Sequence, residues 1–257
     1  MSEKNRDGKR TARERMAVER EKQKAAEKRR RTLIVGASVV CVLGLAAVIG
    51  VVAANAGKDK STGAGPAVAP SGAKGKDSLA IPVGKDGAKS TLTVWEDFRC
   101  PACQAFEAAY RPTLHELSDA GKLRVEYHLV RLIDGNLGGS GSLRAANAAA
   151  CAQDAGKFRD YHDVLYANQP KETDDAFADN DKLIALAGKV KGLDTPAFRK
   201  CVKEGTHDAW VEKSNQAFRT GGFSGTPTVL LDGKNIYQDQ TMTPAKLKQL
   251  VESAHRG

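Results

Sequence analysis

The chain has little net charge outside its first 31 residues. Residues 1–31 contain 13 Lys/Arg and 6 Asp/Glu, whereas the remainder contains 27 and 25, so most of the +9 net charge lies in the N-terminal segment. A nucleic-acid-binding domain carries its basic patch on the folded part. The near-neutral remainder therefore excludes nucleic acid as an expected partner.

The sequence also lacks a second paired motif of metal ligands. Its five histidines are scattered, and only one pair of cysteines lies at short spacing. A tetrahedral zinc site needs further ligands at compatible spacing. We expect no metal, and we expect no cofactor.

Charge and proline are both absent from Leu33–Ala54, a run of 22 residues. As a helix this run would be about 33 Å long, enough to cross the core of a bilayer. Basic residues end directly before it, which predicts a cytoplasmic N-terminus and an extracytoplasmic remainder. The alternative is a signal peptide cleaved after Ala56, but the run exceeds the roughly 7–15 apolar residues of a signal core.

These features divide the chain into four parts. We expect a basic cytoplasmic tail at 1–31, a single transmembrane anchor at 32–54 (apolar residues 33–54), a flexible linker at 55–78 and a folded domain at 79–257. The linker is rich in Gly, Ala, Ser, Lys and Pro and shows no apolar periodicity.

The folded part is predicted to be an α/β domain with a mixed sheet and an inserted helical subdomain at about 135–222. Alternating or β-branched residues predict strands, and apolar residues at helical spacing predict helices. We expect strands at 79–83, 91–98, 123–129, 228–231 and 235–237, and helices at 101–120, 142–168, 181–190, 195–204, 207–218 and 243–255.

The motif Cys100-Pro101-Ala102-Cys103 follows the strand at 91–98 and opens a helix. Cysteines three residues apart can close a disulfide across the first helical turn. A thiolate at the N-cap meets free backbone N–H groups and the positive end of the helix dipole. We therefore expect Cys100 to have a lowered pKa and to be the exposed, attacked sulfur, with Cys103 shielded behind it.

Four of the five cysteines lie outside the apolar run that contains Cys41. An even count outside the cytosol is typical of disulfides. Three connectivities exist, but proximity favours Cys100–Cys103 and leaves Cys151–Cys201. The second pair is interpreted as a structural disulfide, with a second redox pair as the alternative.

Asp97 precedes Cys100 by three residues at the end of a predicted strand. We expect its carboxylate to exchange protons with Cys103 as the disulfide opens. The alternative is a solvated or hydrogen-bonded acid at the strand end, without that role. Glu96 is expected to point to the other face.

Residues 95–103, the helical insertion and Gly225-Thr226-Pro227-Thr228 resemble the DsbA-like branch of the thioredoxin superfamily. The resemblance covers roughly 79–257. It implies a thioredoxin fold, a catalytic disulfide at Cys100 and Cys103, and a cis Thr226–Pro227 bond whose backbone groups meet an extended client.

The resemblance also implies thiol chemistry outside the cytoplasm. Together with the predicted anchor, it leads us to expect a thiol–disulfide oxidoreductase on a bacterial cell membrane, donating its disulfide to reduced, unfolded exported proteins. A membrane redox partner would reoxidise the site, and we expect a monomer. The best-known oxidase of this family has histidine where this chain has Ala102. A disulfide reductase or isomerase, or a non-catalytic client-binding module, therefore remains as an alternative.

Overall fold

The computed structural model describes residues 66–256. The predicted tail, the predicted anchor at 33–54 and the first part of the predicted linker lie outside this range. Between Pro66 and Arg256, no helix has the combination of length and apolar character needed to cross a membrane.

Five strands form one mixed sheet in the order β1-β3-β2-β4-β5. Strands β2 and β3 are parallel, and all other neighbours are antiparallel. The strands are β1 (Ile81–Val83), β2 (Ser90–Glu96), β3 (Leu123–Leu129), β4 (Thr228–Leu231) and β5 (Lys234–Asn235). This confirms the predicted order of elements along the chain, with β2 ending two residues before the predicted end; the order of the strands within the sheet was not predicted.

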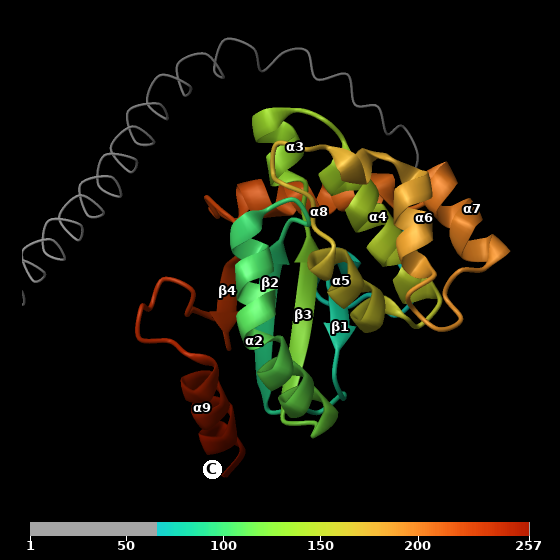
Figure 1. Ribbon diagram of the computed structural model, residues 1–257. Coiled ribbons are helices and arrows are strands. Elements are labelled where there is room, and N and C mark those ends of the chain that lie inside the picture. The colour runs from blue at the N-terminus through green and yellow to red at the C-terminus, as the bar shows by residue number, and fades with distance from the viewer. Residues whose placement is uncertain (1–65, 257) are drawn as a thin grey trace, which may run out of the picture. The chain divides into compact units, whose positions relative to one another are not determined.

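Eight α-helices accompany the sheet in the described part of the chain. They are α2 (Pro101–Asp119), α3 (Leu132–Leu137), α4 (Gly141–Asp154), α5 (Phe158–Ala167), α6 (Asn180–Ala187), α7 (Pro196–Glu204), α8 (Asp208–Thr220) and α9 (Pro244–Arg256). Figure 1 shows α2 lying along the sheet and α4, α6 and α7 grouped beside it.

The helical insertion is confirmed, but its first predicted helix is two helices. The segment 142–168 breaks between α4 and α5 at Gly156, whose φ of 65° lies in the left-handed region that glycine adopts without strain. A further short helix, α3, precedes them and was not predicted. Buried alanines along α4 allow α5, α7 and α8 to pack closely around it.

Side chains of a strand alternate between the two faces of the sheet. In β2, residues on both faces are buried. Leu92, Val94 and Glu96 face the side covered by α2 and α5, and all three are buried. Trp95 points to the opposite side, where it packs with Phe218 of α8. The end of β2 thus delivers Glu96 to the interior behind the α2 N-terminus.

Within the predicted linker, residues 66–78 make several hydrogen bonds with the folded domain. The Ser71 amide donates to Asp154 and the Ser71 carbonyl accepts from Gln153, at 2.7 and 2.8 Å. The Trp210 indole donates to the Ser78 carbonyl at 2.8 Å. The composition of this segment does not predict these contacts, because the segment makes them with its backbone groups and not with its side chains.

Candidate active site

The loop after β2 places Cys100 at the N-cap of α2. Cys100 has extended backbone angles (φ −77°, ψ 118°), and Pro101 takes the first helical position. Proline fits there because that residue's N–H would have no helical partner. The Cys100 amide donates to the Asp97 carbonyl at 3.0 Å, and the Cys100 carbonyl accepts from Gln104 at 3.2 Å. Local sequence therefore builds the helix start that presents the first sulfur.

The Cys100 sulfur lies among polar groups. In the protonated form, its S–H donates to the Thr226 carbonyl at 3.2 Å. A hydrogen bond from the Cys103 thiol, helped by the backbone N–H groups of Cys103 and Ala102, lowers the pKa of Cys100 from 9.0 to about 6 despite burial. The thiolate is thus the main form at neutral pH. The pKa shifts in the predicted direction, but its largest cause is the Cys103 hydrogen bond and not the helix start.

The two sulfurs differ in access and in proton affinity. Cys100 is 6% exposed, less than the surface position we expected, and Cys103 is 0% exposed. Burial raises the pKa of Cys103 well above 9.0, and its neighbours Cys100 and Glu96 raise it further. The two cysteines are not joined by a disulfide in this structure. The pair therefore combines a thiolate with residual access and an inaccessible thiol behind it.

The Thr226–Pro227 bond is cis, as predicted. Pairing of β4 with β2 sets Thr228 opposite Trp95 and so brings this loop to the α2 N-terminus. The Thr228 hydroxyl donates to the Gly225 carbonyl at 2.7 Å within the loop. Thr226 is half-buried and Pro227 is buried, with the Thr226 carbonyl directed at Cys100.

We expected the Asp97 carboxylate to contact Cys103, but the structure does not bring the two together. Its oxygens accept from the backbone amides of Arg99 and Ile133, both at 2.8 Å. Burial raises the pKa of Asp97 to about 7 against these hydrogen bonds. The side chain thus ties the loop before Cys100 to the start of α3, and the hydrogen-bonded alternative describes it better.

Glu96 is the carboxylate whose charge acts on Cys103, and the sequence reasoning missed it. Glu96 is buried, and one of its oxygens lies 2.7 Å from His162 Nε2. The alternation of side chains along the strand could have revealed it, because Glu96 lies on the same face as the buried Val94. An acid on the buried face of a strand at a thiol site is a candidate partner of the buried sulfur.

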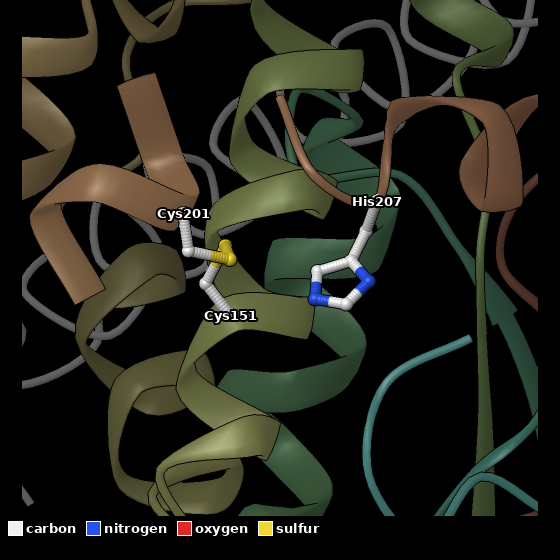
Figure 2. A group of neighbouring side chains, drawn as sticks. All are labelled: Cys151, Cys201 and His207. Atoms are coloured by element: carbon white, nitrogen blue, oxygen red, sulfur yellow. A yellow bond between two sulfur atoms is a disulfide. The ribbon is translucent and has the colours of Figure 1, made fainter. Parts of the chain in front are cut away.

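Cys151 and Cys201 form a disulfide, which confirms the predicted pairing. Figure 2 shows this disulfide between α4 and α7, with the His207 ring beside it. His207 contacts the Val68 carbonyl and the Asp154 carboxylate, both at 2.9 Å. The disulfide lies within the helical insertion and supports its packing.

Comparison with known proteins shows to which family the chain belongs. Residues 77–253, more than half of the chain, match the family described as Thioredoxin. This chain belongs to the thioredoxin family.

Relatives within and around this family share the thiol chemistry. The chain is 28% identical over 154 residues to a probable disulfide bond formation protein D of Bacillus cereus, covering 59% of this chain and 69% of that one. The reduced crystal structure of DsbA from Mycobacterium tuberculosis is similar with a TM-score of 0.60 and 27% identity, over 70% of this chain and 93% of that one.

A third similar structure is the reduced disulfide bond oxidoreductase DsbG of Mycobacterium tuberculosis. It has a TM-score of 0.60 and 29% identity, over 72% of this chain and 90% of that one. With the dithiol at the α2 N-cap, these likenesses show that this thioredoxin-family chain is a DsbA-like protein thiol–disulfide oxidoreductase that acts in oxidative folding.

Proposed function

We propose that the chain donates the Cys100–Cys103 disulfide to reduced, unfolded exported proteins. The stabilised Cys100 thiolate carries this proposal. Whatever stabilises a thiolate of the dithiol form favours reduction of the enzyme and makes its disulfide more oxidising. This supports oxidation over the reductase and isomerase alternatives. The complete exchange-competent pair disfavours a non-catalytic binding module.

The cycle follows from the difference in access between the two sulfurs. A client thiolate attacks Cys100 Sγ, and Cys103 leaves. A second client thiolate attacks the client sulfur of the mixed disulfide, so that Cys100 leaves as a thiolate and the client keeps the new disulfide. The Thr226 carbonyl beside Cys100 is placed to accept a hydrogen bond from a client backbone in extended form.

The same proposal includes a single-pass anchor at 33–54 in a bacterial cell membrane, with the N-terminus cytoplasmic. The charge-free run and the basic residues before it support this orientation. A tether of this kind would keep the domain near exported clients and near a membrane partner that reoxidises Cys100 and Cys103. We expect the chain to act as a monomer.

The decisive experiment combines the reduction potential of the pair with oxidation of a reduced, unfolded client. We expect a potential less negative than the roughly −270 mV of thioredoxin, and stoichiometric oxidation of the client. A strongly reducing value would overturn the proposed direction. Cys100→Ser should abolish client oxidation, and Cys103→Ser should abolish it as well, because neither variant can form the disulfide that a client thiolate attacks. Normal oxidation by Cys100→Ser would remove catalysis by this site.

A fractionation experiment tests the anchor separately. The full chain should sediment with membranes and resist extraction by high salt, and protease added outside the cytoplasmic membrane should digest the catalytic domain. Recovery of a soluble chain that begins after Ala56 would instead support signal-peptide cleavage.

A further inference from the structure

A cavity of about 440 Å³ lies on the face of the sheet that α8 covers, opposite to α2 and α5. It is lined by Trp95 of β2 and His128 of β3, which are partners in the parallel pairing of these strands. The second half of α8 and the segment just before β1 complete it. Its volume is within the range of roughly 300–1,000 Å³ that is typical of ligand pockets.

Uncharged rings form the apolar part of this cavity. The rings of Trp95 and His128 stack with centroids 4.0 Å apart and an interplanar angle of 16°. The Phe223 ring, which also lines the cavity, lies 5.5 Å from that of Trp95. Burial lowers the pKa of His128 from 6.5 to about 4, so its imidazole is uncharged at neutral pH. Rings of this kind favour a planar aromatic ligand, because stacked and edge-to-face contacts each contribute about 0.5–1.5 kcal/mol beyond buried area.

The charged side chains that line the cavity carry one positive charge in excess. They are the cations Lys76 and Lys213 and the anion Asp77. Lys213 Nζ lies 3.8 Å from the Asp77 carboxylate, and both side chains are about half exposed, so this ion pair is loose. Between residues 66 and 256, Lys76 has no ion-pair partner. A ligand with a single negative charge therefore complements the cavity, and a cationic ligand is repelled.

The part of the cavity that carries Lys76 is held in place by the folded domain. The Trp210 indole donates to the Ser78 carbonyl at 2.8 Å. Lys74 and Ala80 exchange backbone hydrogen bonds at 2.8 and 3.0 Å on either side of it. The segment whose composition indicates a linker thus completes a cavity that is already formed in this structure. A pre-formed site loses less affinity to the ordering of its own residues.

The cavity is separate from the dithiol site. Cys100, Cys103 and Thr226 do not line it. Its aromatic residues lie on the other face of the sheet, where Trp95 packs with Phe218 of α8. A molecule in this cavity therefore occupies a different place from a client thiol that attacks Cys100.

We propose that this cavity binds a small aromatic anion. Its ring system would lie against Trp95 and His128, and its carboxylate or sulfonate would lie between Lys76 and Lys213. The Gln216 side chain of α8 also lines the cavity and offers N–H donors to the same anionic group. This ligand site is not used by the disulfide exchange, so the proposal does not depend on the proposed function.

Two probes separate the role of the rings from the role of the charge. Naphthalene-2-sulfonate and 2-naphthol share the same fused rings, but only the sulfonate is charged at neutral pH. The full chain has two tryptophans, so labelling with ¹⁵N-tryptophan gives two indole N–H signals, and Trp95→Phe identifies that of Trp95. We expect naphthalene-2-sulfonate to shift the Trp95 signal of the full chain in a saturable way.

Substitution of the lysines tests the preference for an anion. Lys76→Gln should weaken the binding of naphthalene-2-sulfonate about two- to fivefold, and the double substitution Lys76→Gln and Lys213→Gln about tenfold. The affinity for 2-naphthol should stay the same, because this probe has no charge to lose a partner. Comparing variants with one probe in one detergent cancels the partition of that probe into the detergent.

A matched control excludes a general effect of surface charge. Lys191 is an exposed lysine that does not line the cavity. Lys191→Gln removes the same charge and should leave the affinity for both probes unchanged. Equal weakening of the sulfonate by Lys191→Gln and Lys76→Gln would show that only the net charge of the protein matters, and would overturn the proposal.

Filling the cavity tests the site itself. Ala217 is half-buried and lines the cavity from α8. Ala217→Phe places a phenyl ring in this space and should remove the saturable shift with both probes, at an unchanged melting temperature. If this variant fails to fold, the exposed lysine variants decide the proposal.

Two results would contradict the proposal directly. Absence of a saturable Trp95 shift in the unaltered chain would remove the ligand site, and unchanged sulfonate affinity in the double lysine variant would remove the anionic ligand class. Failure of the proposed function is seen separately. Cys100→Ser should lose client oxidation and keep the affinity for both probes, because Cys100 does not line the cavity.

Discussion

Ionisation of Cys100 should make the stability of the reduced chain depend on pH in a predictable way. The folded-state pKa of about 6 lies below the reference value of 9.0. The group therefore stabilises the folded state fully above the unfolded pKa, and this contribution is lost as the pH falls through the folded pKa. Three pKa units correspond to about 4 kcal/mol at most, and to about 1.4 kcal/mol at pH 7.

The comparison that isolates this contribution is the reduced chain against reduced Cys100→Ser. Their difference in unfolding free energy should grow by about 3 kcal/mol between about pH 6 and about pH 8.5. Titrations of Asp97 and Glu107 are common to both proteins and largely cancel. Cys103 stays protonated in this window because its pKa is raised well above 9.0.

Urea unfolding followed by circular dichroism gives the two free energies at each pH. The reductant must leave Cys151–Cys201 closed, which mass spectrometry after thiol labelling checks. The rate of Cys100 alkylation should show its inflection near pH 6 in the same buffers. A flat stability difference with an alkylation inflection near the reference value of 9.0 would refute the lowered pKa of Cys100.

Three further predictions concern the framework around the dithiol. Asp97→Asn should lower the unfolding free energy at pH 7 by about 1–3 kcal/mol, because an amide cannot accept from both backbone amides with both of its terminal atoms. The alkylation profile of Cys100 should stay the same, and a slower thiol exchange at unchanged stability would restore the proton-transfer role. Replacing Cys151 and Cys201 by serine should lower stability by about 4 kcal/mol in the chain-entropy view, measured by urea unfolding, with no loss of client oxidation; trapping of Cys151 by alkylation during turnover would instead indicate redox activity. Arg99 Nη1 lies 2.7 Å from the buried carboxylate of Asp134. Arg99→Ala should therefore lower the unfolding free energy by about 3–5 kcal/mol, seen as a lower melting temperature and faster proteolysis before α4, and an unchanged melting temperature would contradict this.

The sequence predicted the parts of the site that depend on neighbouring residues. Cys100, Pro101 and Cys103 specify a helix start, since an N-cap and a proline at the first position act within one turn. Apolar periodicity predicted the order of strands and the helical insertion. The resemblance supplied the cis Thr226–Pro227 bond, and the count of cysteines supplied the second disulfide.

Contacts across long stretches of sequence were not predictable in the same way. Asp97 lies next to the Cys100–Cys103 motif, and we interpreted it as the acid that exchanges protons with Cys103. One of its carboxylate oxygens instead accepts a hydrogen bond from the backbone amide of Ile133, which is 36 residues further along the chain. The segment 66–78 looked like a linker because nothing in its composition reveals that Asp154 and Trp210 bind its backbone.

The sequence by itself therefore determined the nucleophile, because helix termini are local objects that a few residues define. Only the tertiary structure decided the charges behind it. Glu96, Glu107 and His162 come from a strand and two helices, and the raised pKa values of Glu107 and His162 depend on their burial close to one another and to Glu96. Periodicity predicts that each residue lies on a buried face, but only the packed fold shows that the three buried side chains are neighbours.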